Sequence, residues 1–415
     1  MNDNREKSLQ QNIIYNTVGS LVYYFSQWLM TVFIVRMSGF NNAGILSLAM
    51  SVTAAPGIIG LFNIRSYQVS DINSQFSNMV YFVSRLFTSA ISVVVCALIT
   101  IYGGYSFEKS SVIMIFMFLK VAESIADVYY GVDQKKGRMD RAGVSLTIRG
   151  IGSLAIFLGL FQVTQSLFIS IFGVTAFSFA VIFLYDARLD SDILNGKDKT
   201  DSISASVKKL LRTCFPLAVV AFLNNLSISI PRLYLEKFHG ETTMGIYSSV
   251  SSPTIVIQLA AATIFAPLIP ILAIKFNNGD KKSFNQIIVK FSMLVLSLTV
   301  VFLIASKFLA EWILVILFGS EIAPFVYLFI PIIIISILIG INASLFSICT
   351  LMREIKSQYL IGAVGVVSSL LLSLWFVKKE SMVGVIVALL GSLILQILIQ
   401  VVLIIRRYGD FEENR

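Results

Sequence analysis

The chain has 415 residues, of which 56% are hydrophobic and 13% are charged. Soluble domains carry about a quarter charged residues, so this composition excludes an ordinary soluble domain and predicts that lipid contacts most of the apolar surface. The formal net charge of +9 needs no nucleic-acid partner, because loops that face anionic lipid headgroups account for it. We expect an all-α polytopic membrane protein.

Apolar stretches long enough to cross a bilayer recur from Asn12 to Ile405. A bilayer core of about 30 Å needs roughly 20 apolar residues per helical crossing. The polar stretch 1–11 precedes a run that is too long for a signal-peptide core, so this run is expected to remain as the first helix. About 12 crossings are predicted. They are 12–35, 43–64, 79–103, 110–131, 143–163 and 165–185, then 212–233, 244–272, 287–306, 324–350, 358–376 and 382–405.

Lys and Arg are distributed as this order of crossings requires. Positive residues are retained on the cytoplasmic side during insertion, and about 20 of the 32 fall in connections expected inside, against about six outside. Both termini are therefore expected in the cytoplasm. Within the stretch 307–323, the run Trp312–Phe318 is too short to cross and is interpreted as an interfacial segment.

The most polar connection, 186–211, is interpreted as a cytoplasmic linker between an N-terminal six-helix lobe (1–185) and a C-terminal six-helix lobe (212–415). An even number of crossings per lobe gives both lobes the same orientation, as in a parallel repeat. A short echo supports the repeat: helix two opens Ala43-Gly-Ile-Leu-Ser47, and helix eight opens Met244-Gly-Ile-Tyr-Ser248.

Polar side chains gather in helices one, two, seven and eight, whereas helices nine, eleven and twelve are close to uniformly apolar. Two interpretations remain open. In the first, the polar helices line a central cavity between the lobes while the others face lipid. In the second, their Ser, Thr and amide groups form hydrogen bonds between packed helices. The amides proposed for the cavity are Asn16, Gln27, Asn224, Asn225 and Gln258.

Three charged residues, Lys120, Glu123 and Asp127, lie in helix four at spacings of three and four, so they project from one face. Arg149 in helix five is their expected partner at a similar depth. One interpretation is a structural salt bridge from Arg149 to Asp127 or Glu123. The other is that the positive charges bind a phosphate, or that Glu123 and Asp127 exchange a proton or sodium ion during transport.

Arginines also mark the ends of the proposed cavity helices. Arg65 follows helix two, and Arg36 and Arg232 end helices one and seven. Contact with lipid headgroups is one interpretation; bidentate phosphate binding is the other. No role is assigned to Arg85, His239 or Lys290.

The sequence offers little for an enzyme. The three cysteines, Cys96, Cys214 and Cys349, are far apart inside predicted helices, so neither a disulfide framework nor a metal site is expected. There is one histidine and no phosphate loop or nucleophile motif, and the outside connections are short. A membrane-embedded polymerase or ligase is the alternative from the enzyme class, and we expect no catalytic residue, metal or cofactor apart from a coupling proton or sodium ion.

Three stretches resemble a known family: Phe62-Asn-Ile-Arg-Ser-Tyr-Gln-Val-Ser-Asp71, Asp127-Val-Tyr-Tyr-Gly-Val-Asp-Gln-Lys-Lys-Gly-Arg-Met-Asp140 and Phe215-Pro-Leu-Ala. They are similar to Wzx-type polysaccharide repeat-unit flippases of Gram-positive capsule and teichoic-acid clusters. The resemblance implies the multidrug/oligosaccharidyl-lipid/polysaccharide exporter fold in a bacterial cell membrane, with two six-helix lobes around a central cavity.

The function implied by this resemblance is to flip undecaprenyl-diphosphate-linked oligosaccharide repeat units from the inner to the outer leaflet by alternating access. Arg65, with Arg149 and Lys120, would hold the diphosphate, the amides would bind sugar, and Arg36 and Arg232 would assist release. A polymerase and glycosyltransferases of the same pathway would be partners. The alternative is a cation-coupled multidrug exporter of the same superfold, although helices one, two, seven and eight lack the carboxylate it would need.

Overall fold

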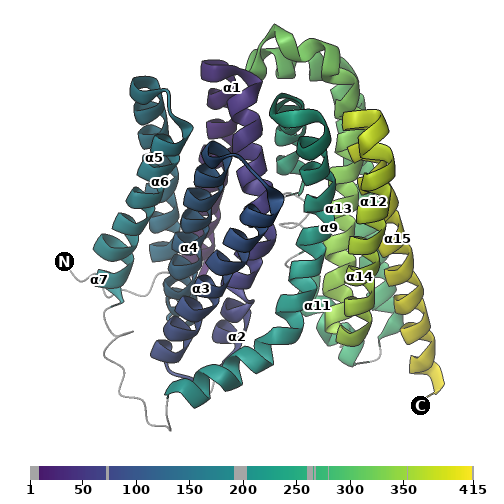
Figure 1. Cartoon of the computed structure of the whole chain (residues 1–415). Coiled ribbons are helices and arrows are strands. Elements are labelled where there is room, and N and C mark those ends of the chain that lie inside the picture. The colour runs from purple at the N-terminus through teal and green to yellow at the C-terminus, as the bar shows by residue number, and fades with distance from the viewer. Residues whose placement is uncertain are drawn as a thin grey trace. The chain divides into compact units, whose positions relative to one another are not determined.

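The computed structural model describes residues 9–71, 74–190, 203–258, 265, 268–278, 280–352 and 354–413. Within these ranges all regular structure is helical (Figure 1). The chain packs into two compact units, Met1–Phe222 and Leu223–Arg415. We call them the first and the second unit and describe each by itself.

The helices of the first unit begin and end at recognisable capping residues. Ser77, Ser106 and Ser166 each accept a hydrogen bond from a backbone N–H in the first turn that follows, and Gly104 ends a helix in the left-handed conformation. The elements are α1 (Leu9–Leu61), α2 (Ile64–Ser70), α3 (Asn78–Gly103), α4 (Phe107–Lys135), α5 (Met139–Thr164), α6 (Leu167–Val181), the π-helix η1 (Ile182–Asp186) and α7 (Ala187–Leu189).

The second unit begins inside a long helix that starts in the first unit. This helix is α9 (Ile203–Ser251). It is followed by η2 (Ser252–Thr254), α11 (Leu268–Asn277), α12 (Lys281–Phe318), η3 (Ser320–Leu328), α13 (Phe329–Leu351), α14 (Ile355–Leu372), the π-helix η4 (Ser373–Val377) and α15 (Lys378–Glu413).

Glycines divide α1 and α9 at corresponding places. Gly39 in α1 has φ 78° and ψ −173°, and Gly240 in α9 has φ 79° and ψ 177°. Side chains disfavour this backbone conformation, so each glycine ends one crossing and begins the next. Gly44 and Gly245 of the sequence echo follow these two breaks at the same spacing. The matching backbone adds weight to the repeat inferred from the sequence.

Eight ranges of the described residues are long and apolar enough to cross a membrane. Three of them each hold two crossings, because Gly39, Gly240 and Ser381 interrupt α1, α9 and α15. Helix α4 is not among the eight ranges, and it carries the three charged residues predicted for helix four. With α4 added, the described part of the chain holds the twelve crossings that the hydropathy pattern predicts.

The stretch Trp312–Phe318 is the last part of a longer helix, and its expected place at the membrane interface stays a prediction. Helix α12 continues through this stretch and covers 38 residues. A helix of that length extends about 57 Å, nearly twice the thickness of a bilayer core. The interval from Lys281 to Phe318 contains no glycine or proline, and the helix ends at Gly319 with φ 96°.

The first turns of α9 belong to the first unit, so the packing boundary at Phe222 falls later than the predicted linker. Leu210 and Cys214 are buried in one cluster with Ile64, Phe76 and Tyr81. The ring of Phe215 lies 6.4 Å from that of Phe62. Residues 191–202 of the predicted linker lie outside the described residues.

The apolar helices predicted to face lipid each carry exposed apolar side chains, among them Leu371 in α14 and Val402 in α15. In α12, most side chains from Val289 to Ile316 are exposed on the second unit. Helix α15 differs, since Ser392, Gln396 and Gln400 are buried at 0–1% exposure. The few polar residues of α15 share one face, which packs against α13 and α14, while Leu398, Val402 and Ile405 are exposed on the rest of the helix.

One ion pair joins the turn between α4 and α5 to the end of α7, and a second lies at the start of α5. Lys136 Nζ lies 2.7 Å from Asp190 Oδ1, and Arg138 Nε lies 3.0 Å from Asp140 Oδ1. Asn12 reaches the same turn, donating to the carbonyl of Gly137 at 2.6 Å. Part of the positive charge counted in this connection is therefore paired within the first unit.

Candidate functional site

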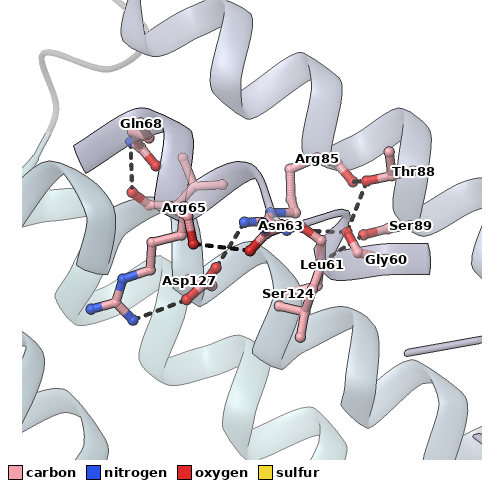
Figure 2. A network of polar contacts seen from close by, with 12 residues as sticks. Gly60, Leu61, Asn63, Arg65, Gln68, Arg85, Thr88, Ser89, Ser124 and Asp127 are labelled. Atoms are coloured by element: carbon pink, nitrogen blue, oxygen red, sulfur yellow. Dashed lines mark hydrogen bonds and ion pairs between the residues drawn. The ribbon is translucent and has the colours of Figure 1, made fainter. Parts of the chain in front are cut away.

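Asp127 on α4 lies between two arginines of the first unit (Figure 2). Its Oδ1 is 3.0 Å from Arg65 Nη1, and its Oδ2 is 2.7 Å from Arg85 Nη2. The side chains of Arg85, Asp127 and Arg65 are 0%, 18% and 30% exposed, so the cluster runs from the interior of the unit to its surface. One carboxylate between two guanidinium groups leaves the cluster one positive charge in excess.

Arg85 ties this cluster to the end of α1. Its Nη1 donates to the carbonyls of Gly60 and Leu61, and the hydroxyl of Thr88 also donates to Gly60, at 2.8 Å. The last carbonyls of a helix have no partner within the helix, so a buried guanidinium that satisfies them fixes where the helix ends. Arg85 thereby positions both Asp127 and the chain that follows α1.

The turn after α1 places Arg65 beside Asp127. Phe62 and Asn63 adopt positive φ values of 44° and 53°, which separate α1 from the short helix α2. Gln68, fully buried in α2, donates to the carbonyl of Val128 at 3.2 Å and holds α2 against α4 (Figure 2). Arg65 is therefore carried on a helix whose position is fixed from both ends.

Arg65 remains accessible after making these contacts. Its Nη1 donates to Asp127 and its Nη2 to Gln134 Oε1, at 3.1 Å. Its guanidinium carbon lies 5.9 Å from the centre of the Tyr130 ring. A guanidinium carries five N–H groups, so a side chain that is 30% exposed with two such contacts has donors left for an anion.

Glu123 and Lys120 continue the partly exposed face of α4. Lys120 Nζ lies 2.8 Å from Glu123 Oε2, and the hydroxyl of Tyr23 donates to Glu123 Oε1 at 2.7 Å. The two charged side chains are 30% and 25% exposed. The predicted common face of Lys120, Glu123 and Asp127 is thus present, and each of the three is ion-paired.

The salt bridge predicted from Arg149 to Asp127 or Glu123 is wrong. Arg149 is 1% exposed, donates from Nη1 to the hydroxyl of Tyr130 at 3.2 Å, and lies 5.6 Å from the centre of the Tyr23 ring. The carboxylates are occupied elsewhere: Arg65 and Arg85 bind Asp127, and Lys120 and Tyr23 bind Glu123.

Several polar side chains of helix one lie inside the first unit. Tyr23 and Thr31 are buried at 7% exposure, and Gln27 lines a mainly apolar cavity together with Phe116 and Phe157. Asn16 is half-buried. Because the hydroxyl of Tyr23 donates to Glu123 on α4, Tyr23 fits the interpretation that these polar groups form hydrogen bonds between packed helices.

The predicted residues of the second unit show the same tendency. Gln258 donates to the hydroxyl of Ser336 at 3.2 Å, and Ser336 donates to Thr254 at 2.7 Å. Asn224 and Asn225 are half-buried. A central cavity between the lobes stays a prediction.

Arg36 and Arg232, which are proposed to assist release of the substrate, lie near the glycines that interrupt α1 and α9, each in its own unit. Arg36 is exposed and lies shortly before Gly39. Arg232 is half-buried, and its side chain interacts with the hydroxyl of Tyr247. Their proposed roles stay predictions.

Arg85 is the important residue that sequence reasoning missed. The sequence analysis assigns it no role, yet it is a cation seven residues into α3. An ionisable residue at that depth inside an apolar helix is rare unless it is paired or functional, and this signal could have identified it.

Two units built from helices long and apolar enough to cross a membrane define a multi-pass membrane protein. The fold is similar to an inward-facing multidrug resistance MATE family transporter of the MOP superfamily, with a TM-score of 0.73 and 10% identity over 97% of this chain and 99% of that chain. It is equally similar to the lipid II flippase MurJ in an inward closed conformation, with a TM-score of 0.73 and 13% identity over 97% of this chain and 90% of that one.

Residues 9–276 match the polysaccharide biosynthesis protein family, and the chain belongs to this family. It is also 27% identical over 314 residues to the capsular polysaccharide biosynthesis protein CapF of Staphylococcus aureus, covering 75% of this chain and 78% of the relative. The family resemblance drawn from the three sequence stretches and the predicted all-α transporter fold are confirmed.

Proposed function

We propose that this protein is a flippase that moves undecaprenyl-diphosphate-linked oligosaccharide repeat units from the inner to the outer leaflet by alternating access, for surface polysaccharide assembly. Membership of the polysaccharide biosynthesis family and similarity to CapF support the pathway. The fold shared with a lipid II flippase supports a lipid-linked substrate. Both termini lie in the cytoplasm in this proposal, and a polymerase and glycosyltransferases of the pathway act with the protein.

The observation that carries this proposal is the accessible guanidinium of Arg65. A diphosphate needs fixed positive charge and several N–H donors, and a planar guanidinium supplies both. Asp127 and Gln134 hold Arg65 in one orientation, while 30% of its side chain stays exposed. Because the positive charge of Arg85 neutralises the carboxylate of Asp127, the positive charge of Arg65 remains available to a ligand.

The other predicted site residues have supporting roles in this proposal. Lys120 is 30% exposed on the same face of α4 and can approach the anionic headgroup, although Glu123 holds its ammonium group. Arg149 is 1% exposed, so it takes no direct part in capture. Glu123 is the better candidate for coupling to a proton or sodium ion, since Asp127 is held by two arginines and Glu123 by one lysine.

Replacing Arg65 tests the proposal in cells. We expect Arg65→Ala to abolish surface polysaccharide, and Arg65→Lys to restore only part of it because an ammonium group lacks the bidentate fork. Arg188→Ala, at an exposed arginine outside the cluster, is the matched control. Immunoblotting of membranes measures insertion, and labelling of cell-surface polysaccharide measures export. Normal export by an Arg65→Ala protein present at wild-type amounts would refute the assignment.

A cation-coupled multidrug exporter remains the second candidate, because the similarity to a MATE transporter is as high as that to the lipid II flippase. Such an exporter should lower drug accumulation in a sensitised strain. The flippase proposal expects unchanged drug accumulation together with loss of surface polysaccharide when the gene is deleted.

A further inference from the structure

Arg149 is a buried cation whose best binding edge is free. The residue is 1% exposed, and its one protein acceptor is the hydroxyl of Tyr130, bound by Nη1. Its Nε and Nη2 have no acceptor among the residues that the structure describes. These two nitrogens form the edge of the guanidinium from which N–H groups point in parallel, the fork that binds an anion with two hydrogen bonds.

No carboxylate in the described part of the chain binds this edge. Glu123 is held by Lys120 and by the hydroxyl of Tyr23. Asp186 is linked to Arg149 only through two hydroxyl groups: Tyr130 hydrogen-bonds Ser145 at 3.0 Å, and Ser145 donates to Asp186 at 3.1 Å. An arginine cannot give up its proton to become neutral, and a buried charge without a bound counter-charge is costly.

The seam between α1 and α5 supplies further donors close by. The backbones of α1 and α5 come close together at two glycines of α5. A Cβ on Gly143 would lie 2.3 Å from the carbonyl oxygen of Tyr15, and one on Gly150 would lie 2.9 Å from the Cα of Tyr23. One turn beyond this contact, Gln27 Nε2 on α1 and Ser153 Oγ on α5 are both buried without a protein partner. An amide NH₂ and a hydroxyl can both donate to an anion.

We propose that the free edge of Arg149 binds a small inorganic anion, of which chloride is the abundant one, inside the first unit. The burial of Arg149 excludes a sugar diphosphate from this position, so the anion site is distinct from the proposed capture of substrate by Arg65. The bound anion balances the buried guanidinium and holds α1, α4 and α5 together. The site therefore stabilises the first unit and does not depend on the proposed substrate.

Thermal unfolding of the purified full-length protein in detergent tests the proposal. Sodium chloride is compared with sodium gluconate at equal ionic strength, because gluconate is too large for a buried site. At chloride concentrations ten times its dissociation constant, we expect the unfolding midpoint to rise by about 2–4 °C, and to keep rising with the logarithm of the chloride concentration above that. Equal midpoints in both salts would overturn the proposal, because the donors would then be satisfied without an anion.

Variants separate this site from other effects of salt. Arg149→Met keeps much of the side-chain volume without the charge, and should lose the chloride response. Arg65→Ala and Arg188→Ala should keep it. A response that persists in Arg149→Met would contradict the assignment.

A second measurement does not depend on the folding of a variant. Anomalous diffraction from wild-type crystals grown with bromide should show a peak at the Nε and Nη2 edge of Arg149. A map without that peak, at a resolution where other bromides appear, would equally contradict the proposal.

Discussion

The two units are held together internally by different chemistry. In the first unit the buried polar groups include charged side chains, among them Arg85, Arg149 and Asp186. In the second unit they are mainly neutral: Gln400 donates to Asn342 at 2.9 Å, and Ser369 donates to the carbonyl of Ser227 at 2.6 Å. Because buried charges are expensive in a membrane and neutral hydrogen bonds are not, we expect changes at the charged residues of the first unit to cost more stability than changes at the neutral polar residues of the second.

The largest effect is expected from breaking the Asp127 cluster. Asp127→Asn keeps the shape of the side chain but leaves the fully buried Arg85 without a counter-charge. Loss of one partner of a buried ion pair costs about 3–5 kcal/mol, so we expect little folded protein, measured by fluorescence-detected size-exclusion chromatography after heating.

A double variant shows whether the unpaired charge is the cause. Arg85→Met together with Asp127→Leu removes both charges and should recover much of the stability lost in Asp127→Asn. The recovery should be incomplete, because Arg85 also binds the carbonyls at the end of α1. A double variant less stable than Asp127→Asn would show that these carbonyl contacts dominate the role of Arg85.

An intermediate effect is expected at Asp71, in the connection between α2 and α3. Burial alone would raise the pKa of Asp71, but hydrogen bonds from the N–H groups of Gln75 and Phe76 and from the hydroxyl of Tyr81 lower this pKa below its ordinary value. A lowered folded-state pKa gives stability that is present above the unfolded pKa of about 4 and is lost as the pH falls through the folded-state pKa.

Asp71→Asn should therefore lower stability at neutral pH by about 1.5–3 kcal/mol, the contribution of hydrogen bonds to a charged group. The difference between wild type and variant should shrink as the pH falls below 4. Thermal unfolding of both proteins from pH 3 to pH 7 measures this. A difference that stays constant with pH would show that the charge of Asp71 has no part in its hydrogen bonds.

The smallest effect is expected in the second unit. Gln400→Leu removes the amide that binds Asn342, and hydrogen bonds between membrane helices contribute about 0.6 kcal/mol on average. We expect a shift of the unfolding midpoint of a few degrees at most, with export unchanged. A loss as large as that of Asp127→Asn would remove the contrast between the two units.

Much of the fold follows from hydropathy and glycine positions. The crossings are readable because each must be a long apolar run, and Gly39 and Gly240 mark turns that hydropathy alone already separates. The continuation of α12 was missed because Lys307 and Glu311 interrupt its apolar pattern without ending the helix.

The pairing of charges was less predictable than their presence. The sequence places Lys120, Glu123 and Asp127 on one face of α4, but the choice of Arg65 and Arg85 over Arg149 depends on how α1 ends and how α2 packs back on α4. Helical spacing gives the face of a residue on its own helix, and it carries no information about which neighbouring helix meets that face.

Translocation in vesicles tests the central claim most directly. The purified protein is reconstituted in liposomes with an undecaprenyl-diphosphate-linked oligosaccharide that carries a fluorescent sugar, and the fraction reached by a membrane-impermeant quencher is followed over time. The flippase proposal predicts that wild-type protein and Arg188→Ala make the inner-leaflet pool accessible, whereas Arg65→Ala leaves it protected. Equal rates for Arg65→Ala and the wild type, or no transfer by the wild type above protein-free vesicles, would contradict it.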